Sequence, residues 1–290
     1  MFDLHFHSTY SDGKSTIPEL SAMIREKNLR YCALTDHNTV DGIRELENCL
    51  DGTMTQVIYG TELTAKYGDD EVHLLAYDFN IDLVEKILKE RNDLVRNQKR
   101  EEMDLAIQLS RQEGLEVTEA LQPNDKQPVT LTTALDICAK RSNQELFLRH
   151  HNQELSPEEL YYKYQAPGKA CAVVRSGVTV EWLVNKLSGV ARDIIIAHPF
   201  VSVSVVTKPL NEQRILEILR MGVTGVEVYH DHTSPVQVEM LKRLVSEKNI
   251  HYSGGSDFHG KENSTPLGYF GPDRRVPDFR LTNYHGEANS

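Results

Sequence analysis

The chain begins Met1-Phe-Asp-Leu-His-Phe-His-Ser-Thr-Tyr-Ser-Asp-Gly13, and this stretch predicts both a β-strand and half of a functional site. Apolar residues at positions 2, 4 and 6 alternate with polar ones, the period-two pattern of a strand with one apolar face. The polar face carries an acid and two imidazoles. His5 and His7 should therefore point the same way from the end of a strand, beside a loop that holds Asp12.

The composition limits the class of protein. A chain of 290 residues is long enough for one large α/β barrel or for two ordinary domains. The formal net charge of −11 disfavours a broad electropositive surface for duplex nucleic acid, but it leaves room for a basic pocket that binds a small phosphorylated ligand.

The chain shows no sign of export or of membrane insertion. The four cysteines form no Cys-x-x-Cys pair, which argues against a cysteine zinc knuckle, and scattered thiols suit a reducing compartment. No apolar run approaches the ~20 residues of a membrane span. Because a strand starts at the first residues, we expect no signal peptide and a cytoplasmic protein with no membrane partner.

Short apolar strands alternate with amphipathic helices in two parts of the chain, 1–81 and 165–290, which is typical of an α/β fold. Between them, 82–164 is charged, favours helix and is nearly free of glycine, and 83–114 has one long helical pattern. We therefore expect an α/β barrel domain formed by 1–81 and 165–290, and a helical insertion or cap at 82–164.

Residues of the types that bind metals lie at or after the ends of successive predicted strands, except that His73 lies on the fourth strand itself. The carboxyl ends of strands in an α/β barrel converge on one face, so residues distant in sequence would meet around one cavity. A mixture of imidazoles and carboxylates suits zinc, manganese or iron, and there are too many ligands for one ion, so we expect two or three. The residues are His5, His7, Asp36, His37, Glu62, His73, His198, Asp257 and His259.

These motifs, in this order, resemble those of the PHP (polymerase and histidinol phosphatase) family, and the length and mid-chain insertion resemble its bacterial nucleoside 3′,5′-bisphosphate phosphatase type. The resemblance implies a distorted seven-stranded barrel with a centre of two or three metals. The motifs are His5-Phe-His7, Ser11-Asp12-Gly13, Thr35-Asp-His-Asn38, Gly60-Thr-Glu62, Glu71-Val-His73, Ala197-His-Pro199 and Gly255-Ser-Asp257-Phe-His259.

The resemblance also implies a role for each residue. His5, His7 and Asp257 would hold the first metal, and Glu62 would bridge to a second metal that His73 and His198 complete. Asp12, His37 and His259 would hold a third. A carboxylate has two oxygens with which to bridge two cations. Asp3 faces the same way as His5 and is a candidate for orienting an imidazole. The residues expected to act in the reaction are Glu62, His198, Asp257 and His259.

The sequence thus predicts a metal-dependent phosphoesterase that hydrolyses small phosphomonoesters, nucleotides above all, by attack of a metal-activated hydroxide on phosphorus. The insertion should form one wall of the cleft. Candidate substrate-binding residues are Lys169, Arg141, Arg149 and His232.

Two alternatives remain open at this stage. One is a 5′→3′ exonuclease that acts on short oligonucleotides and stacks bases on Tyr161, Tyr162 and Tyr164. The other is a metal-binding module without activity, which would have a fully coordinated site with no position for water. The sequence assigns neither a general acid nor an oligomeric state.

Overall fold

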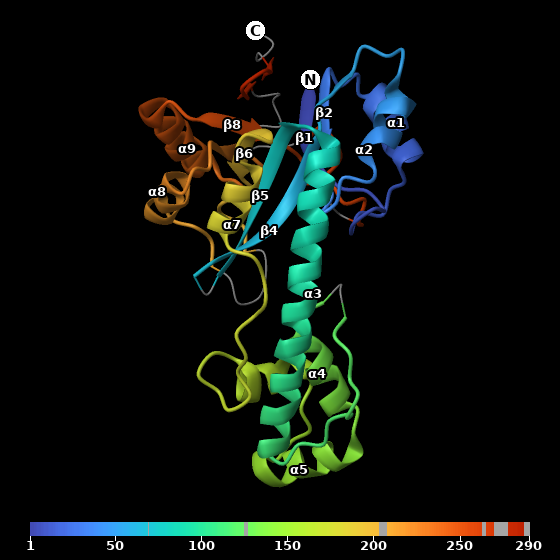
Figure 1. The fold of residues 1–290 in the computed structure, drawn as a ribbon, viewed down its shortest axis with the longest axis vertical. Coiled ribbons are helices and arrows are strands. Elements are labelled where there is room, and N and C mark those ends of the chain that lie inside the picture. The colour runs from blue at the N-terminus through green and yellow to red at the C-terminus, as the bar shows by residue number, and fades with distance from the viewer. Residues whose placement is uncertain (69, 125–126, 203–207, 263–264, 270–277, 287–290) are drawn as a thin grey trace. The chain divides into compact units, whose positions relative to one another are not determined.

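The computed structural model describes residues 1–68, 70–124, 127–202, 208–262, 265–269 and 278–286. The chain forms two compact units, and the first is built from two separate stretches (Figure 1). Met1–Glu90 and Val178–Ser290 make the first unit, and Arg91–Gly177 makes the second. The sequence predicts slightly different domain limits, with one domain formed by 1–81 and 165–290 and the other by 82–164. That these are independently folding domains stays a prediction.

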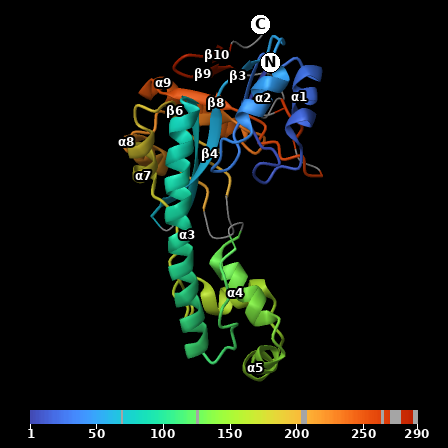
Figure 2. The same cartoon turned by 45° about the vertical axis from the view of Figure 1, so that its right-hand side comes forward.

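Three parallel strands form the smaller sheet of the first unit. Its order is β1 (Phe2–Phe6), β2 (Tyr31–Leu34) and β3 (Gln56–Val57). The connecting helices α1 (Ile17–Glu26) and α2 (Ile43–Leu50) lie beside these strands in Figures 1 and 2. Buried side chains from both layers form one apolar core, among them Phe6, Ile17, Leu20, Ile24, Leu34 and Leu46.

The larger sheet has seven strands. Its helices are α7 (Val180–Leu187), α8 (Glu212–Arg220) and α9 (Pro235–Lys248). The strand order is β10 (His285–Gly286), β9 (Phe279–Arg280), β8 (His251–Gly254), β7 (Gly225–Tyr229), β6 (Ala191–Ile196), β5 (Asp70–Phe79) and β4 (Gly60–Tyr67). Strands β6, β7 and β8 are parallel, whereas β5 is antiparallel to both of its neighbours. The start of β5 therefore lies at the same end of the sheet as the end of β6.

Among the described residues, the backbone ladders of the two sheets are connected by single bridges near this end of the strands. Phe6 pairs with Phe258 after β8, and His37 pairs with Glu62 of β4. The described residues do not close these contacts into a continuous ladder, so the predicted seven-stranded barrel is corrected to an α/β fold with two sheets. Both bridges lie beside residues of the sequence motifs: Phe6 is between His5 and His7, and His37 and Glu62 are themselves motif residues.

The second unit is helical and has its own core. Its first element is the long helix α3 (Ile81–Gln112), which begins in the first unit and agrees with the helix predicted over 83–114. It continues with α4 (Val129–Cys138), α5 (Arg141–His151), α6 (Pro157–Leu160) and the π-helical turn η1 (Tyr161–Gln165). The core of this unit includes Met103, Ile107, Val129, Ile137, Phe147 and Leu160.

Candidate metal centre

The backbone after β1 is fixed from the side of β8. The Asp257 N–H donates to the His5 carbonyl at 2.8 Å, and the His7 N–H donates to the Phe258 carbonyl at 2.9 Å. Gly255 makes this approach possible, since a Cβ there would lie 2.2 Å from the Cβ of His5. Two segments distant in sequence are thereby joined so that their polar side chains face one another.

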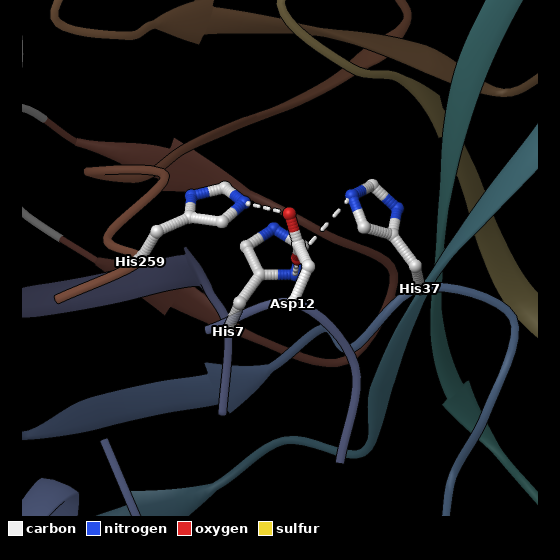
Figure 3. Close-up of side chains that lie close together, drawn as sticks. All are labelled: His7, Asp12, His37 and His259. Atoms are coloured by element: carbon white, nitrogen blue, oxygen red, sulfur yellow. Dashed lines mark ion pairs between the residues drawn. The ribbon is translucent and has the colours of Figure 1, made fainter. Parts of the chain in front are cut away.

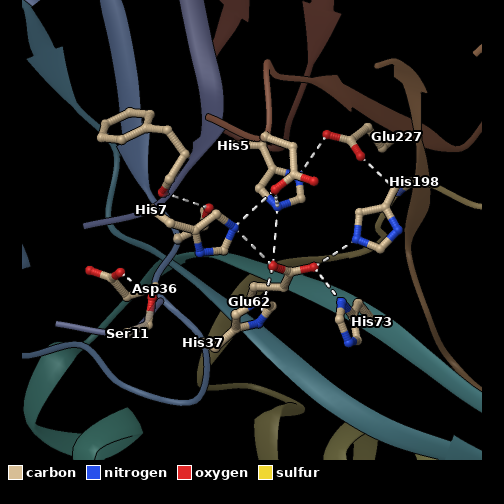
Figure 4. Close-up of polar contacts among 12 residues, drawn as sticks. His5, His7, Ser11, Asp36, His37, Glu62, His73, His198 and Glu227 are labelled. Atoms are coloured by element: carbon tan, nitrogen blue, oxygen red, sulfur yellow. Dashed lines mark hydrogen bonds and ion pairs between the residues drawn. The ribbon is translucent and has the colours of Figure 1, made fainter. Parts of the chain in front are cut away.

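Glu62 is the centre of the cluster (Figure 4). It is buried, and its Oε2 lies 3.2 Å from a ring nitrogen of each of three histidines, while its Oε1 lies 2.8 and 2.9 Å from two more. The first three are His5, His7 and His37, and the other two are His73 and His198. Each oxygen therefore faces its own group of imidazoles.

Asp257 faces the same histidines from the loop after β8. Its Oδ1 lies 3.1 Å from His7 Nε2 and 3.4 Å from His5 Nε2, and its Oδ2 lies 3.4 Å from His230 Nε2. Asp257 has φ near 52°, in the left-handed region that an aspartate adopts more readily than most residues. This backbone conformation directs the carboxylate back toward β1.

Asp12 is the centre of a third group, shown in Figure 3. Its Oδ2 lies 3.1 Å from His259 Nε2, and its Oδ1 lies 3.8 Å from both His7 Nδ1 and His37 Nε2. The two longer separations exceed hydrogen-bond distance. Ligands held by one ion at about 2.0–2.2 Å lie up to about 4.4 Å apart, so these separations suit a shared cation.

Asp36 was expected among the metal-type residues, but it serves the loop instead. Its carboxylate accepts hydrogen bonds from the Ser8 N–H at 2.8 Å and from the Ser8 hydroxyl. It also accepts a hydrogen bond from the Ser11 hydroxyl (Figure 4). Both oxygens are thereby used. Asp36 holds the loop that carries Asp12, and it lies in none of the metal-type groups found among the described residues.

The pKa shifts of the cluster show that its carboxylates stabilise positive charge nearby. Burial alone would lower the pKa of His5, but the nearby carboxylates, Glu227 and Glu62 foremost, raise it well above its ordinary value. In the same way, hydrogen bonds with Asp257 and Glu62 outweigh burial and raise the pKa of His7 to about 9. Burial would raise the pKa of Glu62, yet the surrounding histidines hold it well below its usual range.

His37 behaves differently, because burial prevails over its neighbouring charges and lowers its pKa to about 3. It is therefore neutral at physiological pH, the state in which an imidazole binds a metal.

These residues fit a centre for several metal ions. Three sets of nitrogen and oxygen atoms lie close enough to hold one ion each, with the atoms of a set within 4.8 Å of one another. His7, His37 and Glu62 each belong to two sets, so the sets adjoin. They are His5, His7, Glu62 and Asp257; His37, Glu62 and His73; and His7, Asp12, His37 and His259.

The structure brings together all nine residues that the resemblance assigned to metals. The role of each single ligand stays a prediction. His198 joins through Glu62, whose Oε1 lies 2.9 Å from its Nε2. The expectation that Asp3 orients an imidazole is wrong, because its carboxylate accepts from the backbone N–H groups of His5, Ser256 and Gly268 and from the Ser256 hydroxyl.

Three of the four proposed substrate-binding residues belong to the second unit, and His232 belongs to the first. Arg141 is 93% exposed at the start of α5 and pairs with Glu145, and Arg149 and Lys169 are exposed in the same helical unit. His232 is exposed beside the centre, where its N–H donates to the ring of His230. All four assignments stay predictions.

Sequence analysis did not identify Glu227. Glu227 lies in the middle of the buried strand β7 and contacts both His5 and His198. The signal for it was a lone acid within the apolar run Gly225-Val-Glu-Val-Tyr229, where a charge requires a buried partner.

Geometry and charge together indicate a centre for metal ions at this end of the strands, and the comparisons with known proteins identify the family. The chain belongs to the PHP family: the model of the PHP domain matches residues 3–153, just over half of the chain. The expected family is thus confirmed, and the protein is a metal-dependent phosphoesterase of that family.

The curated relatives differ in activity. The chain is 24% identical over 258 residues to a 5′-3′ exoribonuclease of Haemophilus influenzae, covering 89% of each protein. It is 25% identical over 265 residues to a 3′,5′-nucleoside bisphosphate phosphatase of Chromobacterium violaceum, covering 89% of this chain and 86% of the relative. A 5′-3′ exoribonuclease of Escherichia coli is also 25% identical, with coverage of 89% and 85%.

Solved structures show the same fold. A protein of Bifidobacterium adolescentis suggested to be a metal-dependent phosphoesterase superposes with a TM-score of 0.62 at 20% identity, over 94% of this chain and 93% of that one. An amidohydrolase of Chromobacterium violaceum, solved with bound sulfate and no metal, gives 0.59 at 21% identity, over 94% and 92%. Among the described residues, no helix has the length and apolar character to cross a membrane.

Proposed function

We propose that this protein hydrolyses phosphate esters of small nucleotides, and that a nucleoside 3′,5′-bisphosphate or monophosphate is its substrate. Two or three divalent ions, of manganese, zinc or iron, would be held by the three adjoining sets of ligands. The observation that carries the proposal is the placement of Glu62, whose two oxygens face two different groups of histidines. A carboxylate placed in this way has one oxygen available for each of two ions and would hold them next to each other.

When bound, divalent ions would supply a water nucleophile at neutral pH and would neutralise the charge of a phosphoryl group. The chain contributes the arrangement. His5, His7 and Asp257 form the deeper side of the centre, where the exposed fraction of both histidines is zero. Asp12 and His37 are more open, with 47% and 25% of the side chain exposed. The substrate therefore approaches from the side of Asp12.

The identity of the substrate rests on the relatives and on the chemistry that their substrates share. In a 3′,5′-bisphosphate the 3′ oxygen carries a terminal phosphoryl group, whereas in RNA the same oxygen carries the diester link to the next nucleotide. Cleavage of one bond, between that oxygen and phosphorus, converts either substrate. The net charge of −11 favours the smaller one, because a long polyanion would be repelled.

The exonuclease is the second candidate, and the similarity to two exoribonucleases favours it. Of the three tyrosines considered for stacking, Tyr162 is 53% exposed, and its ring lies 5.3 Å from that of Tyr161. Tyr164 is engaged elsewhere, since its hydroxyl lies 2.9 Å from His151 Nε2. Tyr162 is therefore the tyrosine that is open to a base.

The deciding experiment is an assay of metal-loaded protein on three substrates: a nucleoside 3′,5′-bisphosphate, a nucleoside monophosphate and a 5′-phosphorylated trinucleotide. Release of inorganic phosphate from either of the first two supports the proposal. Release of nucleoside monophosphate from the trinucleotide alone identifies the exonuclease. A protein that binds metal and cleaves none of the three would show that its substrate is a different phosphoester. A Glu62→Gln preparation run in parallel excludes a contaminating phosphatase.

A further inference from the structure

Glu227 is a buried acid whose two oxygens bind two different histidine residues (Figure 4). Its Oε1 lies 3.0 Å from the ring Nδ1 of His5, and its Oε2 accepts the backbone N–H of His198 at 2.7 Å. The exposed fraction of Glu227 is zero. A buried carboxylate without partners is strongly destabilising, so this arrangement depends on both donors.

We propose that Glu227 is a positioning residue, which orients His5 and His198 for the metals without contacting them. The inference rests on the proposed metal centre. Glu227 belongs to none of the three metal-type sets among the described residues, and one of its oxygens is committed to each histidine. It lies behind the ligands, as the acids that orient metal-bound histidines do.

The contact with His5 fixes which ring nitrogen faces the metals. A carboxylate only accepts hydrogen bonds, so Nδ1 of His5 must carry the proton that points to Glu227. Nε2 is the other nitrogen, and it lies 3.2 Å from Glu62 Oε2 and 3.4 Å from Asp257 Oδ1. With the proton on Nδ1, the lone pair of Nε2 is available to bind a metal on the side of Glu62 and Asp257.

The contact with His198 fixes a backbone conformation. His198 has φ near 23°, which is strained for a residue with a side chain. The bond from its N–H to Glu227 holds the chain in that conformation directly after β6, with the ring directed so that Nε2 lies 2.9 Å from Glu62 Oε1. One acid therefore aligns a histidine on each side of Glu62.

A glutamine at this position cannot replace both bonds. Its single carbonyl oxygen can accept from His5 or from His198, and its amide group then faces the other donor. If the amide faces His5, the ring accepts at Nδ1 and carries its proton on Nε2, where it blocks the metal. If the amide faces His198, two N–H groups oppose each other and the backbone must move. Either arrangement weakens the centre.

The test is the affinity of metal-free protein for manganese, measured by calorimetry for wild type and Glu227→Gln. We expect the affinity to fall about 10- to 100-fold, the usual effect of losing such a partner. The matched control is Asp193→Asn. Asp193 is equally buried and pairs with His251 Nδ1, but His251 is the first residue of β8, whereas the centre follows the end of that strand. The control should bind manganese like wild type.

A second measurement does not depend on how well the variant folds. In wild-type protein loaded with zinc and labelled with ¹⁵N-histidine, NMR should show His5 protonated at Nδ1 and not at Nε2. Unchanged manganese affinity in Glu227→Gln, or His5 protonated at Nε2 in wild type, would overturn the inference. Failure of the proposed function gives a different result, because wild type would then bind metal normally but hydrolyse no nucleotide.

Discussion

Two histidine–carboxylate clusters lie at opposite ends of the same strands, and they differ in how completely their polar groups are satisfied. At the start of β6 and β8, Asp193 accepts from His251, from the Thr282 N–H at 2.9 Å and from the Thr282 hydroxyl at 3.0 Å. After the ends of these strands, His198 and Asp257 belong to the centre around Glu62.

The first cluster is complete without a ligand, whereas the second is not. Within the described part of the chain, buried Nδ1 atoms of His7, His37 and His198 have no hydrogen-bond partner. Carboxylates there raise the pKa of neighbouring histidines, which means that they stabilise added positive charge. The same residue types therefore serve stability at one end of the sheet and binding of cations at the other.

Removal of metal should give the largest effect. Protein treated with a chelator should lose all phosphoesterase activity, and manganese should restore it. Each ion at 100 times its dissociation constant should add about 2.7 kcal/mol to the free energy of unfolding. Activity assays and thermal unfolding with and without manganese measure both. Active protein with fewer than two ions per chain by elemental analysis would refute the multi-metal centre.

The substitution Glu62→Gln should give the second-largest loss of activity. The substitution keeps the shape of the side chain but removes the charge that faces two groups of histidines, so we expect kcat to fall on the order of 100-fold or more. Steady-state kinetics on the best nucleotide substrate measures this. Asp193→Asn, which removes a buried acid from the complete cluster, should keep wild-type turnover. Near-normal turnover of Glu62→Gln would remove this residue from the bridge.

Much of the centre could be predicted because its residues follow strand ends, where sequence pattern and strand direction together place side chains. His198 and Asp257, which follow β6 and β8, are such cases, whereas Glu62 lies within β4, opposite Leu75 of β5. His73 also belongs to the centre, but for a reason that the sequence does not show: β5 is antiparallel to its neighbours, so its beginning lies at the site.

The supporting residues were harder to predict, because their role depends on pairing across strands. Glu227 faces the site only because β7 lies between β6 and β8, a strand order that periodicity does not give. Asp3 shares a strand face with His5, yet it binds the loop at Ser256 and Gly268 rather than a ring. Barrel closure was overestimated for the same reason, since the sheets meet through single bridges.

Substitution of the candidate substrate-binding residues should change activity by an intermediate amount. A cation of the helical unit that binds a second phosphate should contribute about 1.5–3 kcal/mol, or roughly ten- to 150-fold in specificity. We expect one of Lys169→Ala, Arg141→Ala and Arg149→Ala to lower kcat/KM for a bisphosphate by that factor, with little change for a monophosphate. The ratio of the two kcat/KM values is the measurement. If all three variants keep the wild-type ratio, a monophosphate is the better substrate.

The smallest effect on activity should come from the complete cluster itself. Asp193→Asn leaves an amide where the carboxylate accepted three hydrogen bonds, and the amide nitrogen then opposes at least one donor of His251 or Thr282. Loss of such a buried partner costs about 1–3 kcal/mol. Denaturant unfolding should show that loss, while kcat/KM at a temperature where the protein is folded should stay within about twofold of wild type. A large fall in kcat/KM without loss of stability would show that the two ends of the sheet are coupled, and the division between a stabilising cluster and a metal-binding cluster would then be wrong.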